Sequence, residues 1–464
     1  MQTTVAPTRD AALAALARVR PAAYARSRNH LEGAVTGLSP WLTHGLLTLP
    51  EVLAAALRQG PLDIGHTLVR ELGWRVWFRH VWAQRGSGIL QSLHPGPRPQ
   101  AETDDPRALP DDIRCGRTGV PAIDQAVHTL YATGTLHNHA RLWLASYVVH
   151  LRHLNWRAGA DWMLGHLLDG DLASNHLSWQ WVAGTGSHKP YLFNADNVAR
   201  HAPAAWHSPG SVIDRSYEAL EQIARHGPPV GGDGARRGWR RGPEAAAMMA
   251  GAMSATTAAA ALGPPPLLTQ PPADLALADV PAEAAARLRG RRVWLVHPWA
   301  LRAPDADGLG RGTRAGSASA SDAAIGMPGT TAAVVTADTP DTAASAPLPQ
   351  DETPLIIGVW PREHTLAWPW SERRWRWVHA AMRGVTDEIW FTDRAGLARA
   401  LHGAAEVRSV ADPHVTPWLQ GLAALQPEPL LFPAVDTPCQ SWSQWWSRAT
   451  RGLKQAGELL LPPG

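Results

Sequence analysis

The stretch Asp169-Gly-Asp-Leu-Ala-Ser-Asn-His-Leu-Ser-Trp-Gln-Trp181 combines two carboxylates, a carboxamide and two indoles. We predict a loop followed by a helix, on which Asn175 and Trp179, four residues apart, lie one above the other. Trp181 then lies about 200° around the helix from Trp179, on the far side. The two aspartates precede the helix, where acidic residues often cap the first turn. Core packing does not explain the polar residues interleaved with the apolar ones in this stretch, so the stretch as a unit favours a ligand site.

A second cluster lies upstream, where Asn138 and Arg141 are three residues apart and share one face of a predicted helix. The neighbouring Leu142, Trp143 and Leu144 make this helix apolar on most sides, which indicates burial. A buried arginine needs a partner, and we predict an ion pair with Asp169. The alternative is an ordinary surface arginine.

Earlier still, Tyr24 and Arg28 precede Val35-Thr-Gly-Leu-Ser-Pro40. Small hydroxyl residues and backbone N–H groups before a helix can bind phosphate, although a Ser-Pro pair is also an ordinary helix start. Glu71 and Arg75 are four residues apart on a predicted helix, which by itself indicates one ion pair.

Composition limits the classes of function. The 464 residues favour two domains. A net charge of +3 permits a nucleic-acid partner without requiring one. Two cysteines, Cys115 and Cys439, exclude a cysteine-rich zinc or iron–sulfur site, and we expect no metal. No apolar run approaches 18 residues, so we expect no membrane span and a cytoplasmic protein.

The chain divides into segments that differ in composition and in apolar spacing. Residues 10–225 show the apolar spacing of helices. Residues 226–289 are rich in Ala, Gly and Pro and predict a linker, and residues 303–352 predict a disordered insertion. Residues 290–460 predict a small α/β, parallel-sheet, Rossmann-like domain. Its expected strands are 292–297, 354–360, 388–392, 406–410 and 430–432, and its expected helices are 373–382, 396–401 and 442–457.

In their order along the chain, these motifs resemble those of the photolyase/cryptochrome family. The matching motifs are Tyr24/Arg28, Val35-Thr-Gly-Leu-Ser-Pro40, Glu71-Leu-Gly-Trp-Arg-Val-Trp77, Thr118-Gly-Val-Pro-Ala-Ile-Asp124, Leu136-His-Asn-His-Ala-Arg141 and the stretch from Asp169. The resemblance covers residues 10–225. Family members usually carry an α/β antenna domain before the helical domain. We expect no such N-terminal domain here, and because the α/β segment follows instead, we transfer no antenna chromophore to it.

The resemblance implies a mainly α-helical FAD-binding domain and damaged DNA as partner, and it leaves protein partners unknown. The implied FAD-binding residues are Tyr24, Thr36, Gly37, Leu38, Ser39, Arg75, Arg141, Asp169, Gly170, Asp171 and Asn175. Those implied to contact DNA with a flipped-out pyrimidine dimer are Arg28, Glu71, Trp74, Asn138, His139 and Trp181. The implied catalytic residues are Glu71 and Asn138, with Trp179 and Trp156 as the proximal and middle members of a tryptophan chain that reduces the flavin.

We expect light-driven repair, with cyclobutane dimers as substrate. The family's (6-4) enzymes use histidines where Asn138 and Leu142 stand here. The alternative is a blue-light receptor without repair, which His139, Val76 and the absence of Trp from residues 91–117 favour. Without that distal Trp, either electrons would leave through another residue, such as Trp143 or Trp162, or photoreduction would be slow. A degenerate scaffold that no longer binds FAD is a third possibility, which the retained polar pocket disfavours.

Overall fold

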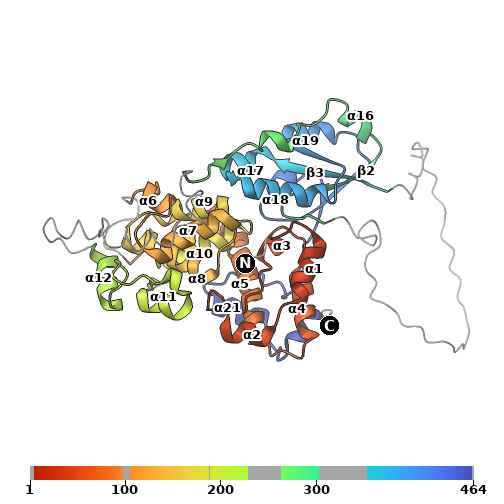
Figure 1. Ribbon diagram of the computed structural model, residues 1–464. Coiled ribbons are helices and arrows are strands. Elements are labelled where there is room, and N and C mark those ends of the chain that lie inside the picture. Colours follow the sequence, from red (N-terminus) through yellow and green to blue (C-terminus); the bar gives the residue numbers. More distant parts are fainter. Residues whose placement is uncertain (1–4, 98–104, 188, 228–262, 303–352, 462–464) are drawn as a thin grey trace, which may run out of the picture.

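A helical part and an α/β part lie side by side in the computed structural model (Figure 1), which describes residues 5–97, 105–187, 189–227, 263–302 and 353–461. The predicted fold class, a helical domain followed by a parallel-sheet α/β domain, is confirmed. The predicted insertion at 303–352 and most of the predicted linker, residues 228–262, lie outside the described residues.

Local sequence signals account for the helix ends in the first part. Thr48 and Glu51 form a capping box at the start of α4. Pro121 stands in the first turn of α7, and Gly134 ends that helix in the left-handed conformation. The helices are α1 Arg9–Ala17, α2 Pro21–Ser27, α3 Ser39–Thr43, α4 Leu49–Leu57, α5 Thr67–Arg85, α6 Asp111–Arg114, α7 Pro121–Thr133, α8 Asn138–Ser146, α9 Trp156–His166, α10 Leu172–Ala183, α11 Ala195–His201 and α12 Tyr217–His226.

The second part contains a five-stranded parallel sheet in the order β5-β3-β2-β6-β7. The earliest strand, β2, lies in the middle of the sheet. The next strands are added on one side of β2, and β6 and β7 are then added on its other side, as in doubly wound folds. The strands are β2 Arg292–Val296, β3 Leu355–Pro361, β5 Glu388–Thr392, β6 Glu406–Val410 and β7 Ala424–Gln426. The helices are α16 Ala284–Leu288, α17 Arg362–Ala367, α18 Glu372–Arg383, α19 Arg394–Ala400, α20 Thr416–Leu419 and α21 Trp442–Ala449.

Several boundaries differ from the sequence-based expectation; among them, the expected helix 442–457 ends at Ala449. Residues 263–289 of the expected linker are folded, because β1 (Leu267–Leu268) pairs with β4 (Trp370–Ser371) and α16 packs against α19. The expected strand 430–432 is wrong: β7 lies earlier, and Phe432 packs on α21 instead. The α/β domain also ends before residue 460, because α21 packs against α5 of the helical part. A Cβ on Gly73 would lie 2.7 Å from the Trp446 ring, so this glycine admits α21.

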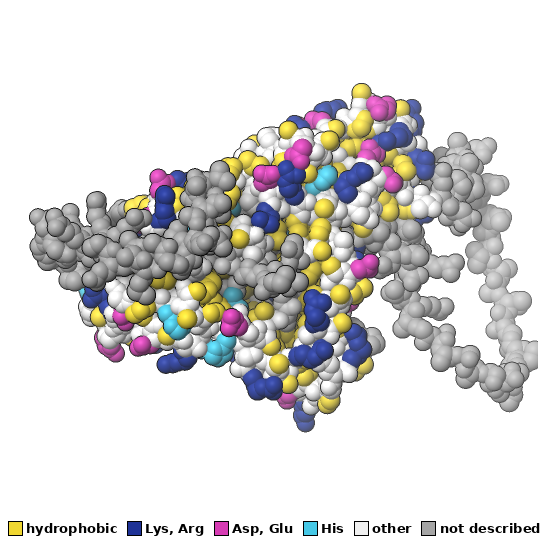
Figure 2. All heavy atoms as spheres, viewed as in Figure 1, with side chains coloured by type: hydrophobic (Ala, Val, Ile, Leu, Met, Phe, Trp, Pro, Cys, Tyr) yellow, Lys and Arg dark blue, Asp and Glu magenta, His cyan; other side chains and the backbone are white. Residues whose placement is uncertain are grey.

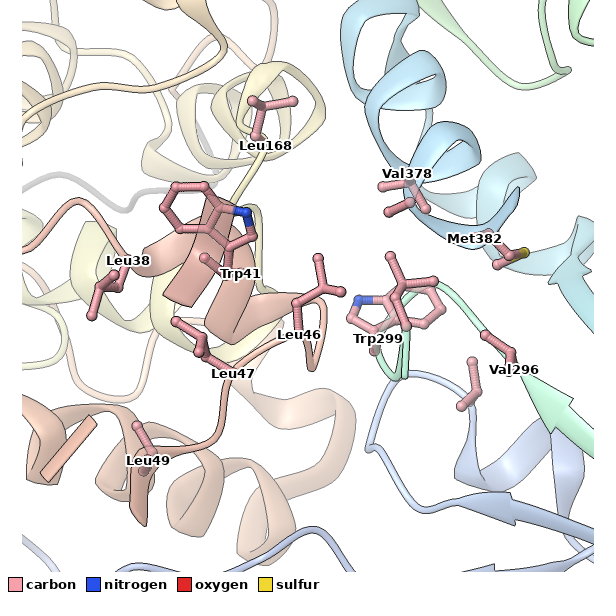
Figure 3. Close-up of a cluster of buried hydrophobic side chains, with 14 of the residues drawn as sticks. Leu38, Trp41, Leu46, Leu47, Leu49, Leu168, Val296, Trp299, Val378 and Met382 are labelled. Carbon is pink, nitrogen blue, oxygen red and sulfur yellow. The ribbon is translucent and has the colours of Figure 1, made fainter. Parts of the chain in front are cut away.

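One hydrophobic core runs through both parts (Figure 3). Trp41, Leu46 and Leu47 from the helical part share it with Trp299 and Val378 from the α/β part. A second core lies within the helical part, around α7, α8 and α9. Since apolar burial is the main favourable term in folding, the shared core joins the two parts into one packed body.

Candidate functional site

A cavity lies between α5, α8, α9 and α10, with about 850 Å³ of atom-free space counted to its mouth. Its wall combines polar side chains with aromatic and aliphatic ones. The lining residues are Ser39, Glu71, Trp74, Arg75, Phe78, Asn138, Arg141, Leu142, Ala145, Met163, Asp169, Ser174, Asn175, Ser178, Trp179 and Val182.

Arg141 and Asp169 form the predicted ion pair in the cavity wall. Nη2 of Arg141 donates to both carboxylate oxygens, at 2.9 and 2.8 Å, and Nε donates to the Leu136 carbonyl at 2.8 Å. The Asp169 carboxylate is nearly buried and Arg141 is about a quarter exposed. The pair therefore presents a fixed cation and a fixed anion at the cavity.

Asn175 lines the same cavity from α10. Its Nδ2 donates to the carbonyl of Ala160 at 2.9 Å. This bond fixes the side chain in the wall and leaves the amide oxygen as its free acceptor.

Asp171 is placed differently from Asp169. Its Oδ1 caps α10, accepting hydrogen bonds from the Ser174 amide and hydroxyl, each at 2.8 Å. Its Oδ2 lies 3.6 Å from Arg79, and Asp171 is absent from the cavity lining. The implied role of Asp171 as a cofactor contact is therefore not supported by its position, because capping and ion pairing use the carboxylate.

Tyr24, Arg28 and Glu71 form a cluster at the cavity. Arg28 pairs with Glu71 at 3.1 Å, so the ion pair expected between Glu71 and Arg75 does not form. Burial raises the pKa of Glu71 above its usual value. Burial and the nearby Glu71 charge raise the pKa of Tyr24 to about 12, which keeps the phenol protonated. Arg75 instead donates to the Thr43 hydroxyl at 3.1 Å.

The predicted phosphate-binding turn precedes α3. Gly37 has a φ of +65°, a conformation that favours glycine. Ser39 lines the cavity, whereas the Leu38 side chain is buried in the core, so Leu38 offers only its backbone to a ligand. Thr36 accepts a long hydrogen bond, 3.5 Å, from the Leu38 amide.

The tryptophans of the predicted electron path lie on neighbouring helices. Trp179 lies against α9 at Gly159, where a Cβ would be 2.2 Å from the indole. Trp156 starts α9 and its ring is 6.1 Å from that of His176. The His176 ring is in turn 5.5 Å from Trp368, a half-exposed residue of the α/β part.

Three of the residues implied to contact DNA, Arg28, His139 and Trp181, do not line the cavity. His139 faces the rings of His137 and His201, at 5.8 and 5.4 Å. Trp181 is exposed and contacts Tyr191. Trp74 lines the cavity, but its ring is also stacked on Trp442 of α21 at 4.8 Å. The C-terminal helix thus supports this wall of the cavity.

Several residues of this region gave no interpretable signal in the sequence. Arg79 pairs with Asp412 at 2.8 Å and with Glu428 at 3.3 Å. His414 and Arg374 reach the turn at residues 168–172 from the α/β part. These contacts join segments more than 200 residues apart, which no local periodicity predicts.

Arginines are exposed on the first two helices. Arg18, Arg20 and Arg26 are exposed near Arg28 in the sequence, and Figure 2 shows Lys and Arg side chains over the lobe that contains α1, α2 and α4.

Within the described ranges, no cluster of three or more His, Cys, Asp or Glu side chains is arranged to hold a metal ion. None of the helices described has both the length and the apolar character needed to cross a membrane.

Comparison with known proteins identifies similar sequences for this region. Residues 68–216 match the family model described as the FAD binding domain of DNA photolyase. A deoxyribodipyrimidine photo-lyase of Streptomyces griseus is 36% identical over 166 residues, which are 35% of each chain. The cryptochrome DASH, chloroplastic/mitochondrial, of Oryza sativa subsp. japonica is 35% identical over 171 residues, covering 35% of this chain and 29% of the relative.

Solved structures give weaker similarity. The archaeal photolyase from Sulfolobus tokodaii aligns over 47% of this chain and 48% of its own, with 26% identity and a TM-score of 0.36. The chain spans about a third of the length of these two curated relatives.

Proposed function

Through residues 68–216 this chain belongs to the photolyase/cryptochrome family, and from that membership we propose that it uses light to split cyclobutane pyrimidine dimers in DNA. The cavity between α5, α8, α9 and α10 is the proposed site. The observation that carries the proposal is the convergence of Arg141, Asp169, Asn175 and Glu71 on this cavity.

The residues of the cavity fit FAD. Arg141 supplies a fixed positive charge, and the Asn175 oxygen supplies an acceptor within the same wall. Ser39 and the preceding backbone can receive phosphates at the opening of α3. Bound in its reduced form and excited by light, FAD would lend one electron to the dimer, and the electron would return to it after the cyclobutane bonds break.

The protein's own residues would select and hold the damaged base pair. Flipping a damaged nucleotide costs a few kcal/mol, less than flipping an intact one. Trp74 in the cavity wall offers an aromatic face, and stacking on such a face recovers about 1–3 kcal/mol per base. Glu71 can donate or accept a hydrogen bond at the dimer, where charge develops during the reaction. The Glu71–Arg28 pair holds that carboxyl in place.

Arginines outside the cavity would bind the DNA backbone. Exposed Arg18, Arg20 and Arg26 are suited to phosphate contacts, which are sequence-independent and weaken with salt. His139, which lies outside the cavity lining, would contact the DNA only at the rim.

The direct test starts from an absorption spectrum of the purified full-length protein. Bound oxidised flavin is expected to give its characteristic near-ultraviolet and blue bands. Dimer-containing single-stranded DNA is then illuminated with the reduced protein, and loss of dimers is measured. A protein that carries flavin but leaves dimers intact would exclude the repair proposal.

That same result would favour a blue-light receptor, our second candidate. The observation that favours a receptor is the direct contact of the α/β part with the turn that carries Asp169. Such a contact would let a change at the flavin reach the α/β part. A receptor is expected to change shape or partner binding with light and to ignore damaged DNA.

A further inference from the structure

The turn from Leu168 to Leu172, which carries Asp169, is held by side chains of the α/β part. Arg374 of α18 donates from Nη2 to the Gly170 carbonyl at 2.6 Å, and from Nη1 to the Leu164 carbonyl at 2.9 Å. At the other end of the turn, the Leu172 amide donates to Nε2 of His414 at 3.2 Å. Arg374 therefore holds the middle of the turn and His414 holds its last residue.

Gly170 shows how close this approach is. A Cβ at this position would lie 2.4 Å from Nη1 of Arg374 and 2.5 Å from the Leu164 carbonyl oxygen. The backbone of Gly170 has no positive φ, so the glycine is required by space and not by its conformational freedom. The glycine between the two aspartates is thus matched to an arginine of the other domain.

His414 is oriented for its role by Asp412. Its Nδ1 lies 2.6 Å from the Asp412 carboxylate, and its ring stacks on Trp299 at 4.6 Å with an interplanar angle of 5°. With the proton on Nδ1, Nε2 is left as an acceptor for the Leu172 amide. The arrangement leaves His414 little freedom to turn away.

Arg374 also brings a positive charge to the turn that carries Asp169. The side chain is fully buried, with its guanidinium 4.0 Å from the centre of the Trp370 ring. In the part of the chain that the structure describes, no carboxylate lies within 4 Å of the Arg374 guanidinium. The two nearby aspartates, Asp169 and Asp171, are paired with Arg141 and Arg79. Burial lowers the pKa of Arg374 to about 9, which still leaves the group protonated at neutral pH.

We propose that Arg374 and His414 are positioning residues of the flavin site, which hold Asp169 against Arg141, and that the charge of Arg374 stabilises the anionic reduced flavin. This inference rests on the proposal that the cavity binds FAD. In this proposal the α/β part contributes to the chemistry of the helical part, because its side chains hold the backbone of the turn that carries Asp169.

Arg374→Met tests both halves of the proposal, with Arg376→Met as the matched control on the same helix, where Arg376 is exposed and bonded to Asp274 and Glu372. Hydrogen exchange of the peptide covering residues 168–173 is measured in the full chain freed of FAD. We expect faster exchange in Arg374→Met, by about tenfold or more if one net hydrogen bond to a charged group is lost. The control is expected to exchange as the wild type does.

The reduction potential of bound flavin is the second measurement. We expect a more negative potential in Arg374→Met, because the reduced anion loses a nearby positive charge, and no shift in the control. Arg374→Lys keeps the charge and is expected to preserve most of the potential. A potential and an exchange rate that are unchanged in Arg374→Met would overturn the proposal.

His414→Phe gives an independent variant if Arg374→Met does not fold. Phenylalanine keeps a ring to stack on Trp299 and removes the acceptor of the Leu172 amide. We expect faster exchange at Leu172, and an unchanged rate would overturn the role of His414. If no variant or wild-type protein binds FAD, the proposed function fails, while the exchange measurements still decide whether these residues hold the turn.

Discussion

Arg141 contacts both oxygens of Asp169 through a single guanidinium nitrogen, at 2.9 and 2.8 Å. The contact joins α8 to the turn before α10 across one wall of the cavity. Arg141→Met is expected to leave the nearly buried Asp169 carboxylate without its partner. Hydrogen bonds to charged groups contribute about 1.5–3 kcal/mol, so we expect FAD affinity to fall by about one to two orders of magnitude, measured by fluorescence titration.

The double variant Arg141→Met/Asp169→Asn serves as the control for this pair. Neutralising Asp169 removes the unpaired charge, so stability to urea should recover relative to the single Arg141 variant. FAD affinity should stay low, because the positive charge is still missing. Full recovery of FAD affinity in the double variant would contradict a direct role for Arg141 at the flavin.

Glu71→Gln separates DNA chemistry from flavin binding. Glutamine keeps a hydrogen-bonding amide but loses the carboxyl group and its pairing with Arg28. We expect slower dimer splitting per absorbed photon with little change in FAD content. Glu372→Gln, on an exposed face of α18, is the control and should repair dimers at the wild-type rate. Equal repair by Glu71→Gln and the wild type would remove Glu71 from the proposed mechanism.

One interaction between two of the motifs could be predicted from the sequence. The Arg141–Asp169 pair follows from the apolar helix around Arg141, since a buried arginine needs a counter-charge and the stretch from Asp169 supplies one. The start of α4 at a capping box and the end of α7 at the left-handed Gly134 are likewise encoded in the local sequence.

Contacts between distant segments could not be predicted in the same way. Nothing around Arg374 distinguishes it from its neighbours Arg373 and Arg376, which are not buried as it is. Likewise, the two aspartates of the motif look alike in the sequence, and only the position of Arg79 shows that Asp171 faces an ion-pair network. Leu430 and Phe432 have the composition of a strand, but Phe432 packs on Trp445 and Trp446. Tertiary packing decides these cases.

The network of Arg79, Asp171 and Asp412 predicts sensitivity to acid. Arg79 and its neighbours lower the pKa of Asp171 to about 2, despite burial, and hold the pKa of Asp412 well below its usual range. An aspartate in the unfolded chain has a pKa of about 3.9. The stability from these groups is therefore present above about pH 4 and is lost as the pH falls from there towards 2.

Asp412→Asn is the corresponding variant. We expect it to lower the free energy of unfolding at pH 7 by the order of 2 kcal/mol and to weaken the acid dependence between pH 4 and 2. Urea unfolding at several pH values measures both effects. Asp274→Asn, at an exposed ion pair with Arg376, should change stability little. An equal effect of the two variants would refute the importance of the buried network.

The buried His166 predicts a second pH dependence of the free energy of unfolding, in a higher pH range. Its ring lies between those of Tyr131 and Trp162, at 4.7 and 5.7 Å, and burial lowers its pKa to about 3. The unfolded chain takes up this proton near pH 6.5, so stability falls as the pH drops below 6.5, by up to about 1.4 kcal/mol per pH unit for one proton. His166→Phe should flatten the slope between pH 6 and 4, and an unchanged slope would assign it to other groups, such as His137.

Trp368 predicts where electrons leave the flavin site. The sequence lacks a tryptophan between residues 91 and 117, which left Trp143 and Trp162 as candidates for the exit. In the structure, however, Trp143 packs on Phe193, and Trp162 donates its N–H to Tyr131 at 3.1 Å. The ring of His176 instead connects Trp156 to the half-exposed Trp368.

Trp368→Phe is therefore expected to slow photoreduction of bound flavin by an external thiol several-fold, while FAD content stays unchanged. Trp162→Phe is the matched control and should reduce at the wild-type rate. Absorbance of oxidised flavin under continuous blue light provides the measurement, with Trp179→Phe as the variant in which reduction should be slowest. If Trp162→Phe is slow and Trp368→Phe is not, electrons leave through Trp162 and Tyr131, and the α/β part takes no part in the path.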